Sequence, residues 1–569
     1  MVRSVYCSML YRPLVFLAIL FAVLIAACDS GTADPRMTDP PVTERVAACH
    51  GVQGTLHTGA IDTETWRADR PHVIRDSLIV QGTLVIEAGV KVCGDSAAAI
   101  LITTNGRLNA LGSAAAPIIF TATDPAKPWA GIDVQYDCSD LGCVLPPLRG
   151  QIRHALFEYA QNAVTGLQVD SSHFRQIRCT AVRTRYLAYS VVDTAGISGC
   201  SAVVMGSRSG GTDTFLGNII RGSGGDGLAF VAQALHTSGR LTASLILRDS
   251  RIENSAGTGL LFNSWYVDAN VLEGGPIRIV GSGSRAVEAP LAAVLQLWPT
   301  RAAQDSLLGN GNDTLLVWGD ASSGEIVVRE NMHWRFRSDI LRPWWILAGV
   351  DVDVEPDGTL IVESELRMQG SLLVQGTAAQ PANLVGAIIR QCMSPGPCST
   401  RLSHASLTNV LLFTGPNATL DHLQISGGGI SLGSMSVLTQ SIITGTAGLM
   451  LADNTRVEHT IIRGSIANGV SIWGSNVLLA DCEVSGSRFD AIRVVSGAPV
   501  LTNIQVRNCI LENSTDAGIN STGTQPSLVD ARFNWWGDAA GPFGPAGDSV
   551  SANVDYSSFL TTRPVIRID

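Results

Sequence analysis

Short stretches in which aliphatic and polar residues alternate recur along most of the chain, and no helix-length amphipathic run interrupts them. In the second half an aliphatic residue, a variable residue and Gly or Asn recur together at intervals of 18, 19, 22 and 27 residues. The members of this series are Ile425-Ser426-Gly427, Ile443-Thr444-Gly445, Ile462-Arg463-Gly464, Val484-Ser485-Gly486 and Leu511-Glu512-Asn513. Each interval suits one coil of a solenoid with variable loops. The pattern therefore predicts an all-β chain folded as a parallel β-solenoid rather than as βαβ units.

Strand alternation assigns the side chains of these coils to two faces. The inward set is Leu423, Ser441, Thr460, Cys482 and Cys509. The outward set is His422, Gln440, His459, Asp481 and Asn508, with Glu483 in a second outward row. Cys482 and Cys509 would stack about 4.8 Å apart on successive coils, which allows either a ladder of buried thiols or a disulfide. The outward set is either a ligand face for an extended sugar or an ordinary solvated face.

The chain also carries an internal duplication. The stretch from Gly106 to Pro117 has the pattern G-x-L-x-x-x-G-[ST]-A-A-x-P, which returns from Gly370 to Pro381, 264 positions later. Gly82-Thr83-Leu84 precedes the first copy and Gly358-Thr359-Leu360 the second, and Trp66 is echoed by Trp334. We therefore predict two homologous halves, 49–300 and 301–569, and the sequence leaves open whether they stack as one solenoid.

The first residues have the pattern of an export signal. Residues 14–27 form an apolar run of the length of a signal-peptide core, and small residues precede Cys28. This junction resembles the lipobox of bacterial lipoproteins, which implies cleavage before Cys28 and acylation of that residue. We therefore expect a signal peptide at 1–27, a lipid-anchored flexible tether at 28–48 with several prolines, and a place in the cell envelope, at the outer membrane, the cell surface or the periplasm.

Beyond Cys7 and Cys28 the chain has ten cysteines, an even number that suits an oxidising compartment. Cys138 with Cys143, and Cys392 with Cys398, bracket short loops at matching places in the two halves. We predict that a disulfide closes each loop, because neither carries the histidine or second Cys pair of a zinc site. The connectivity of the others stays open, namely Cys49, Cys93, Cys179, Cys200, Cys482 and Cys509.

Composition narrows the classes of partner. The net charge of −10 argues against nucleic acid, which requires a clustered basic surface. Asp351, Asp353 and Glu355 fall on one face of a strand and suggest a weak Ca²⁺ site, but a solvated acidic strand explains them more simply. We expect no cofactor and no other metal, and the sequence does not indicate an oligomeric state.

The last coils carry a more specific signature. Asn534-Trp535-Trp536-Gly537 is followed by a Gly-Pro turn and by Val554-Asp555-Tyr556. This segment resembles the closing element of bacterial secreted proteins with right-handed parallel β-helix repeats, and the duplicated glycine stretch resembles their opening coils. The resemblance implies a right-handed parallel β-helix of the pectin- and pectate-lyase type. The two tryptophans then either cover the open end of the helix or stack on sugars.

That fold also hosts polysaccharide lyases and glycoside hydrolases, so activity has to be argued from a site. Lys91 and Lys127, the only lysines, lie in or near the opening coils, and no hydrolase-like cluster of aspartates stands out. Four arginines suit an acidic sugar but lack an accompanying base: Arg175, Arg178, Arg183 and Arg185. We therefore name no catalytic residue and expect a non-catalytic scaffold or polysaccharide-binding protein. The alternative is a carbohydrate-active lyase or hydrolase using His422, His459, Asp481 and Glu483.

Overall fold

Each coil of the folded chain is built from three short strands separated by turns. One coil consists of β43 (Arg456–Glu458), β44 (Ile461–Arg463) and β45 (Val470–Ile472). These strands pair in parallel with the three strands of the next coil, β46 (Val477–Ala480), β47 (Glu483–Ser485) and β48 (Ile492–Val494). Strands therefore stack into three columns, which we call the first, second and third column in the order in which a coil visits them.

The computed structural model divides the chain into two units, Met1–Ala48 and Cys49–Asp569. It describes Cys49 and residues 54–135, 148–206, 212–231, 241–262, 267–275, 277–298, 301–304, 307, 309–310, 314–318, 324–328, 333–336, 344–347, 350–391, 398–495, 500–522 and 528–568. The expected signal peptide and tether lie outside these residues. No helix in the described ranges has both the length and the apolar character needed to cross a membrane.

In the first half, the columns begin at β1 (Thr55–Ile61) and β3 (His72–Val80), which run through the second and third columns. The first column holds β2 (Glu64–Trp66), β4 (Thr83–Ile86), β7 (Arg107–Leu111), β10 (Gly150–Arg153), β13 (Gln168–Asp170), β16 (Tyr186–Ala188), β19 (Thr212–Leu216), β22 (Leu241–Arg248) and β25 (Val267–Gly274). The second holds β5 (Lys91–Gly94), β8 (Ile118–Ala122), β11 (Ala155–Glu158), β14 (His173–Arg175), β17 (Val191–Asp193), β20 (Ile219–Arg221), β23 (Ser250–Glu253) and β26 (Ile277–Val280). The third holds β6 (Ala99–Ile102), β9 (Gly131–Val134), β12 (Val164–Thr165), β15 (Val182–Thr184), β18 (Val203–Met205), β21 (Leu228–Phe230), β24 (Leu260–Phe262) and β27 (Val287–Pro290).

In the second half, four longer strands turn a corner and serve two columns each: β33 (Thr359–Met368), β35 (Ala382–Gln391), β36 (Thr400–Thr408) and β38 (Thr419–Ser426). The first column also holds β29 (Gly324–Val328), β32 (Val350–Val354), β34 (Leu372–Gln375), β40 (Val437–Thr439), β49 (Ile504–Arg507), β52 (Val529–Asp530) and β53 (Val554–Asp555). The second holds β28 (Thr314–Trp318), β30 (His333–Phe336), β41 (Ile442–Thr444) and β50 (Ile510–Glu512). The third holds β31 (Trp344–Leu347), β37 (Leu411–Phe413), β39 (Gly429–Leu432), β42 (Leu449–Leu451) and β51 (Ile519–Asn520).

Residues with left-handed backbone make the corners of the coils. A single residue with positive φ joins the first strand to the second, as at His459 (φ 46°) and Asp481 (φ 52°). A second such residue follows the second strand, and Gly464 (φ 62°) and Asn513 (φ 62°) are examples. Gly adopts this region at no steric cost, and Asn, Asp and His enter it more readily than other side chains. The Ile-x-Gly series of the sequence therefore marks the same corner of successive coils.

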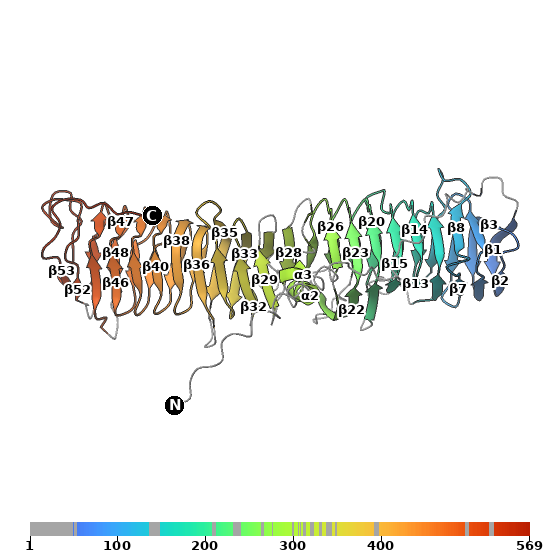
Figure 1. Cartoon of the computed structure of the whole chain (residues 1–569), viewed down its shortest axis with the longest axis horizontal. Helices are drawn as coiled ribbons and strands as arrows, with labels where there is room; N and C mark the ends of the chain where they lie inside the picture. Colours follow the sequence, from blue (N-terminus) through green and yellow to red (C-terminus); the bar gives the residue numbers. More distant parts are fainter. Residues whose placement is uncertain are drawn as a thin grey trace, which may run out of the picture. The chain divides into compact units, whose positions relative to one another are not determined.

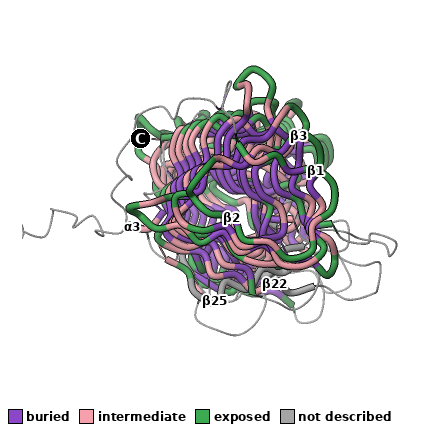
Figure 2. The backbone as a smooth tube through the Cα atoms, turned by 90° about the vertical axis from the view of Figure 1, so that its right-hand side faces the viewer, coloured by how far each residue is buried: buried purple, intermediate pink, exposed green. Residues whose placement is uncertain are grey.

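The core is a set of aliphatic ladders inside the coils. One ladder runs through register-paired residues of the first column: Leu420, Leu438, Val457, Leu479 and Val506. Figure 2 shows such buried segments lining the inside of coil after coil. The predicted inward residues, Leu423, Ser441, Thr460, Cys482 and Cys509, are all buried, which confirms that part of the face assignment. Burial of these ladders supplies the main driving force of the fold.

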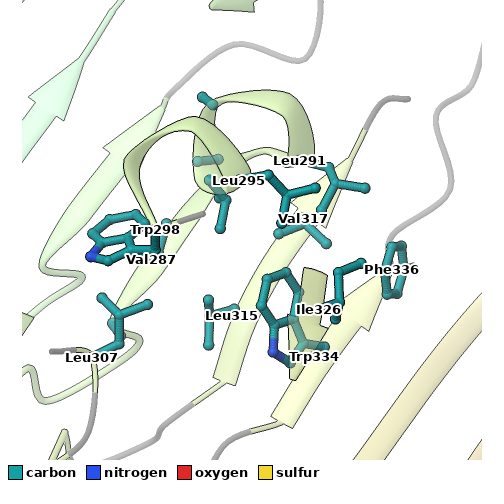
Figure 3. Close-up of a cluster of buried hydrophobic side chains, with 14 of the residues drawn as sticks. Val287, Leu291, Leu295, Trp298, Leu307, Leu315, Val317, Ile326, Trp334 and Phe336 are labelled. Carbon is teal, nitrogen blue, oxygen red and sulfur yellow. The ribbon is translucent and has the colours of Figure 1, made fainter. Parts of the chain in front are cut away.

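The two halves join as one solenoid. β27 of the first half pairs in parallel with β28, and β28 pairs with β30 of the second half. Figure 1 shows β26, β28 and β33 in one uninterrupted row of strands. The short helices α2 (Leu291–Leu297) and α3 (Arg301–Gln304) lie at this junction. Figure 3 shows Leu295 of α2, Leu315 of β28 and Trp334 of β30 in a single buried cluster. The third column of the first half thus continues into the second column of the second half, and one hydrophobic core runs through both.

The structure corrects one part of the predicted alignment of the two halves. The two glycine stretches begin β7 and β34, which both belong to the first column. Thr83–Ile86 forms β4, which pairs directly with β7, whereas Thr359–Val362 begins β33 in the second column. The flanking match was therefore wrong, because strands of either column bury alternate aliphatic residues and look alike in sequence. The strand equivalent to β4 is β32, which pairs with β34.

Two disulfides are present among the described cysteines, Cys49–Cys93 and Cys179–Cys200. Cys482 and Cys509 are buried free thiols. Of the two possibilities left open by the sequence, the thiol ladder is therefore present and the disulfide is not. Cys398 is disulfide-bonded, whereas Cys138, Cys143 and Cys392 lie outside the described residues. The two predicted loop disulfides therefore stay predictions.

Candidate functional site

The outward residues predicted from alternation form one line along the corner between the first and second columns. His404, which was not in that set, occupies the same corner one coil earlier, and we call the six residues the corner column: His404, His422, Gln440, His459, Asp481 and Asn508. Each has left-handed backbone, with φ between 45° for His404 and 55° for Asn508. In β36 and β38 the pairing register skips His404 and His422, so they project from the corner rather than from a strand face. The prediction that His422 faces outward agrees with its partial exposure. The later members, Gln440, His459, Asp481 and Asn508, lie between strands and not within one.

Two histidines and one carboxylate are in contact at the start of the corner column. The rings of His404 and His422 lie with their centroids 4.5 Å apart, and His422 Nδ1 lies 2.7 Å from Asp421 Oδ2. Thr439 Oγ1 donates to Asp421 Oδ1 over 2.6 Å. Burial raises the pKa of Asp421, but the bonds from Thr439 and His422 outweigh it and hold the pKa below its ordinary value. Asp421 is therefore an ionised carboxylate that orients His422.

Glu483 lies two residues beyond the corner column and is already engaged in ion pairs. Its side chain is 5% exposed, and Arg463 binds both carboxylate oxygens, with Nε–Oε1 at 2.6 Å and Nη2–Oε2 at 2.9 Å. Ser485 Oγ donates to Oε1, and Arg563 Nη2 lies 3.3 Å from Oε2. Burial raises the pKa of Glu483, yet the bonds from Arg463 and Ser485 keep it below the ordinary value. This carboxylate therefore anchors the C-terminal segment through Arg563.

The four sequence candidates do not form one cluster. His459 and Asp481 occupy adjacent coils, whereas Gln440 separates His422 from His459. The described hydrogen bonds of His422 and Glu483 run to Asp421 and to Arg463, Ser485 and Arg563. A line at one-coil spacing is suited to contact along a polymer, since each residue meets a different unit of an extended ligand.

The arginines considered for an acidic sugar are divided between ion pairs and the surface. Arg175 pairs with Glu158 in an alternating row of register-matched charges on the second column: Glu158, Arg175, Asp193, Arg221 and Glu253. Arg185 Nε donates to the fully buried Asp213 over 2.9 Å. Burial raises the pKa of Asp213 to about 6 despite that partner. Arg178 and Arg183 are exposed.

The suggested Ca²⁺ strand is an ordinary half-exposed strand. Val352 and Val354 of β32 are buried, and Asp351 Oδ1 accepts a bond of 2.7 Å from the backbone N–H of Ser371. Across the described ranges, no group of three or more His, Cys, Asp or Glu side chains is arranged to hold a metal ion. Asp351 therefore serves the turn that begins the next coil.

The two tryptophans near the end of the chain have distinct surroundings. Trp536 is fully buried, and Trp535 Nε1 donates to Glu512 Oε2 over 2.9 Å. The preceding Asn534 is also fully buried and bonds to backbone groups of the coil before it. These contacts tie the segment to the last coils.

Sequence reasoning missed a cleft of about 630 Å³ beside the last strands of the first column. Its residues include Gln505, Asp530 and Asp555, which are paired in register across β49, β52 and β53. The one sequence signal is that these three polar residues follow one another at a constant interval of 25 positions. A volume of this size is typical of sites for small ligands.

The comparisons with known proteins concern the later coils. Residues 447–531, which run from the turn before β42 to β52, match the family model described as "Right handed beta helix region". No curated protein matches the chain. The match agrees with the parallel columns, the left-handed corners and the internal ladders of the described coils. The chain is a right-handed parallel β-helix repeat protein.

Proposed function

We propose that this protein is a lipid-anchored β-helix of a bacterial cell envelope that binds extended polysaccharide as a non-catalytic scaffold. The observation that carries the proposal is the corner column, in which imidazole, amide and carboxylate groups repeat once per coil. Stacked strands are about 4.8 Å apart, so the column offers donors and acceptors at a regular spacing along the helix. A repeating polymer can meet such a row with many weak contacts of the same kind.

The backbone of the corner column is ordered before any ligand arrives. His459 N donates to Ala480 O over 3.2 Å, and Asp481 N donates to Arg507 O over 3.1 Å. Each corner is thereby tied to the end of a strand in the next coil. A preordered backbone lowers the entropic cost of binding, so contacts that are individually weak can add up to useful affinity.

The lowered pKa values of Asp421 and Glu483 disfavour these two carboxyl groups as general acids. General acids in glycoside hydrolysis need a raised pKa, whereas the pKa values of Asp421 and Glu483 are lowered. Glu483 is also held by two guanidinium groups, which favours a structural role. The carbohydrate-active lyase or hydrolase is the alternative, and it predicts unsaturated or shortened products from acidic polysaccharides.

A binding experiment with matched variants tests the proposal. Asn508→Ala and His459→Ala change exposed or half-exposed corner residues and should weaken retention of the protein by polysaccharide in affinity electrophoresis. Asn417→Ala is the control, because Asn417 is an exposed residue with left-handed backbone at another corner. Equal retention of all three variants would refute the corner column as a ligand face. Release of unsaturated uronate, followed by ultraviolet absorbance, would instead establish the enzyme.

The lipid anchor has its own test. Acylation of Cys28 requires its thiol, so Cys28→Ser should move the protein from the membrane fraction to the soluble fraction and abolish labelling by a fatty-acid analogue. Acylated, membrane-bound Cys28→Ser protein would overturn the anchor without affecting the polysaccharide proposal.

A further inference from the structure

We infer that the cleft beside β49, β52 and β53 is a binding site for a neutral, polyhydroxylated sugar chain. This inference rests on the proposed function and gives it a defined site and ligand class. The cleft lies beside β49, and this strand leads into the corner column at Asn508, three residues after Gln505 of the cleft floor. A polymer lying along the corner can therefore continue into it.

The floor of the cleft is polar. Gln505 pairs in register with Asp530, and Asp530 with Asp555, so the three side chains project from successive strands. Gln505 Nε2 donates to Asn503 Oδ1 over 2.7 Å, which fixes the amide and uses one of its two N–H groups. Planar amide and carboxylate groups bind pairs of neighbouring hydroxyl groups well, because they offer two polar atoms side by side.

The cleft lining holds two carboxylates, Asp530 and Asp555, and one guanidinium group, that of Arg532. Arg532 binds Asp530 through Nε and Nη2 at 2.9 and 3.0 Å, and Arg507 Nη2 approaches Asp530 Oδ2 at 2.7 Å. These bonds, that of Arg532 foremost, hold the pKa of Asp530 far below its ordinary value. Hydrogen bonds from Ser557 lower the pKa of Asp555, so both carboxylates are ionised near neutral pH.

This arrangement disfavours an anionic ligand. Two carboxylates of the lining face one guanidinium group, and Arg532 already binds Asp530 and lies 3.9 Å from Asp555 Oδ2 through its Nε. A uronate, sulfate or phosphate entering the cleft would meet Asp555, whose side chain is 48% exposed, while Arg532 is already shared between Asp530 and Asp555. Neutral hydroxyl groups, in contrast, can both donate to Asp555 and accept from Gln505.

The walls supply the apolar contact that sugars also need. Leu528 is 72% exposed and Val500 is 42% exposed, and both line the cleft. Exposed aliphatic side chains beside fixed polar groups are the usual composition of a small-ligand site. They can pack against the C–H faces of pyranose rings while the floor binds the hydroxyl groups.

The test compares neutral with acidic glycans on the purified full-length protein in detergent. Calorimetric titration with soluble glucan, mannan and galactan oligosaccharides should show saturable binding to at least one of them, and polygalacturonate and alginate oligosaccharides should bind less tightly. Gln505→Ala and Leu528→Asp should each weaken binding about five- to tenfold, since each removes one contact from the site. Gln424→Ala is the matched control, because Gln424 is an exposed glutamine on β38 that is outside the cleft.

Each outcome of these titrations supports or refutes either the ligand class or the position of the site. Tighter binding of the uronates would overturn the ligand class, and unchanged affinity of Gln505→Ala and Leu528→Asp would overturn the site. In the second case, polysaccharide binding by the wild type that is lost in the corner variants would leave the proposed function intact. Absence of binding to every glycan would refute both proposals. Circular dichroism and the melting temperature of each variant show whether a loss of affinity reflects misfolding.

Discussion

Replacing Asn534 by alanine should open the last coils of the β-helix. The side chain is 0% exposed and makes three bonds to the backbone. Its Oδ1 accepts from Cys509 N over 2.8 Å, and its Nδ2 donates to Val506 O and Ala531 O, both over 2.7 Å. Alanine leaves one buried N–H and two buried carbonyl groups without this partner.

The three lost bonds set the size of the effect. A typical intramolecular hydrogen bond contributes about 1 kcal/mol, and a buried group left without a partner costs somewhat more, so the expected loss is about 3 kcal/mol. In a solenoid each coil contacts only its neighbours, so this loss should stay near the substitution. Amide hydrogen exchange followed by mass spectrometry is therefore the suitable assay. Peptides covering residues 504–512 should exchange about a hundredfold faster, since each 1.4 kcal/mol corresponds to about a factor of ten.

Two further variants make the prediction for Asn534 sharper. Asn417→Ala, at an exposed corner, should change exchange by less than about threefold. Asn534→Asp keeps the acceptor for Cys509 but removes both donors and buries a charge, so it should be at least as damaging as alanine. If the amides of residues 504–512 exchange as slowly in Asn534→Ala as in the wild type, the hydrogen bonds of Asn534 do not stabilise these coils and the prediction is refuted.

Three other changes test separate parts of the structure. Cys482→Ser should lower the free energy of unfolding, measured in urea, by about 1 kcal/mol or less. Ser441 is fully buried in the equivalent place, and its Oγ donates to the carbonyl group two residues back, as Cys482 Sγ does. A loss above about 3 kcal/mol would contradict this equivalence. Trp334→Ala should lower the free energy of unfolding by about 3–5 kcal/mol, because Trp334 is buried at the junction of the two halves. In calorimetry the two halves should then unfold in separate transitions. One unchanged transition would disprove the shared core. Asp213 has its folded pKa raised to about 6, so the stability it contributes is fully present below its ordinary pKa of 3.8 and is lost as the pH rises through 6. The unfolding free energy of the wild type minus that of Asp213→Asn should therefore fall by up to about 3 kcal/mol between pH 4 and 7, and a flat difference would refute the raised pKa.

The repeat of the fold was predictable because it depends on backbone geometry. Gly427, Gly445, Gly464 and Gly486 all have positive φ at the same corner of successive coils, and glycine meets that demand without strain. A corner that favours one residue type can be recognised in the sequence even when the loops between corners vary in length. The burial of Ser441 and Thr460 followed from the same register.

The positions of the outward residues were harder to predict. Alternation extended backward from Ile443 places Gln440 on a strand, whereas the chain turns at Gln440 with φ 48°. Sequence alternation cannot show a one-residue corner, because a left-handed residue keeps the side chain outward while it changes the direction of the chain. Side-chain partners were equally hidden, since Glu483 and Arg563 are 80 positions apart.

Long separations along the chain also explain why the cleft could not be predicted. Its floor combines Gln505, Asp530 and Asp555, one residue from each of three coils, and no two of them are closer than 25 positions in the chain. Inside the helix, aliphatic residues must repeat for the coils to stack, so the core leaves a periodic pattern. On the outside, stacking makes no such demand, and polar residues are free to vary between coils. A cleft that combines amide and carboxylate groups with exposed leucine and valine is therefore a feature that stacking alone does not require, which favours a role in binding a ligand.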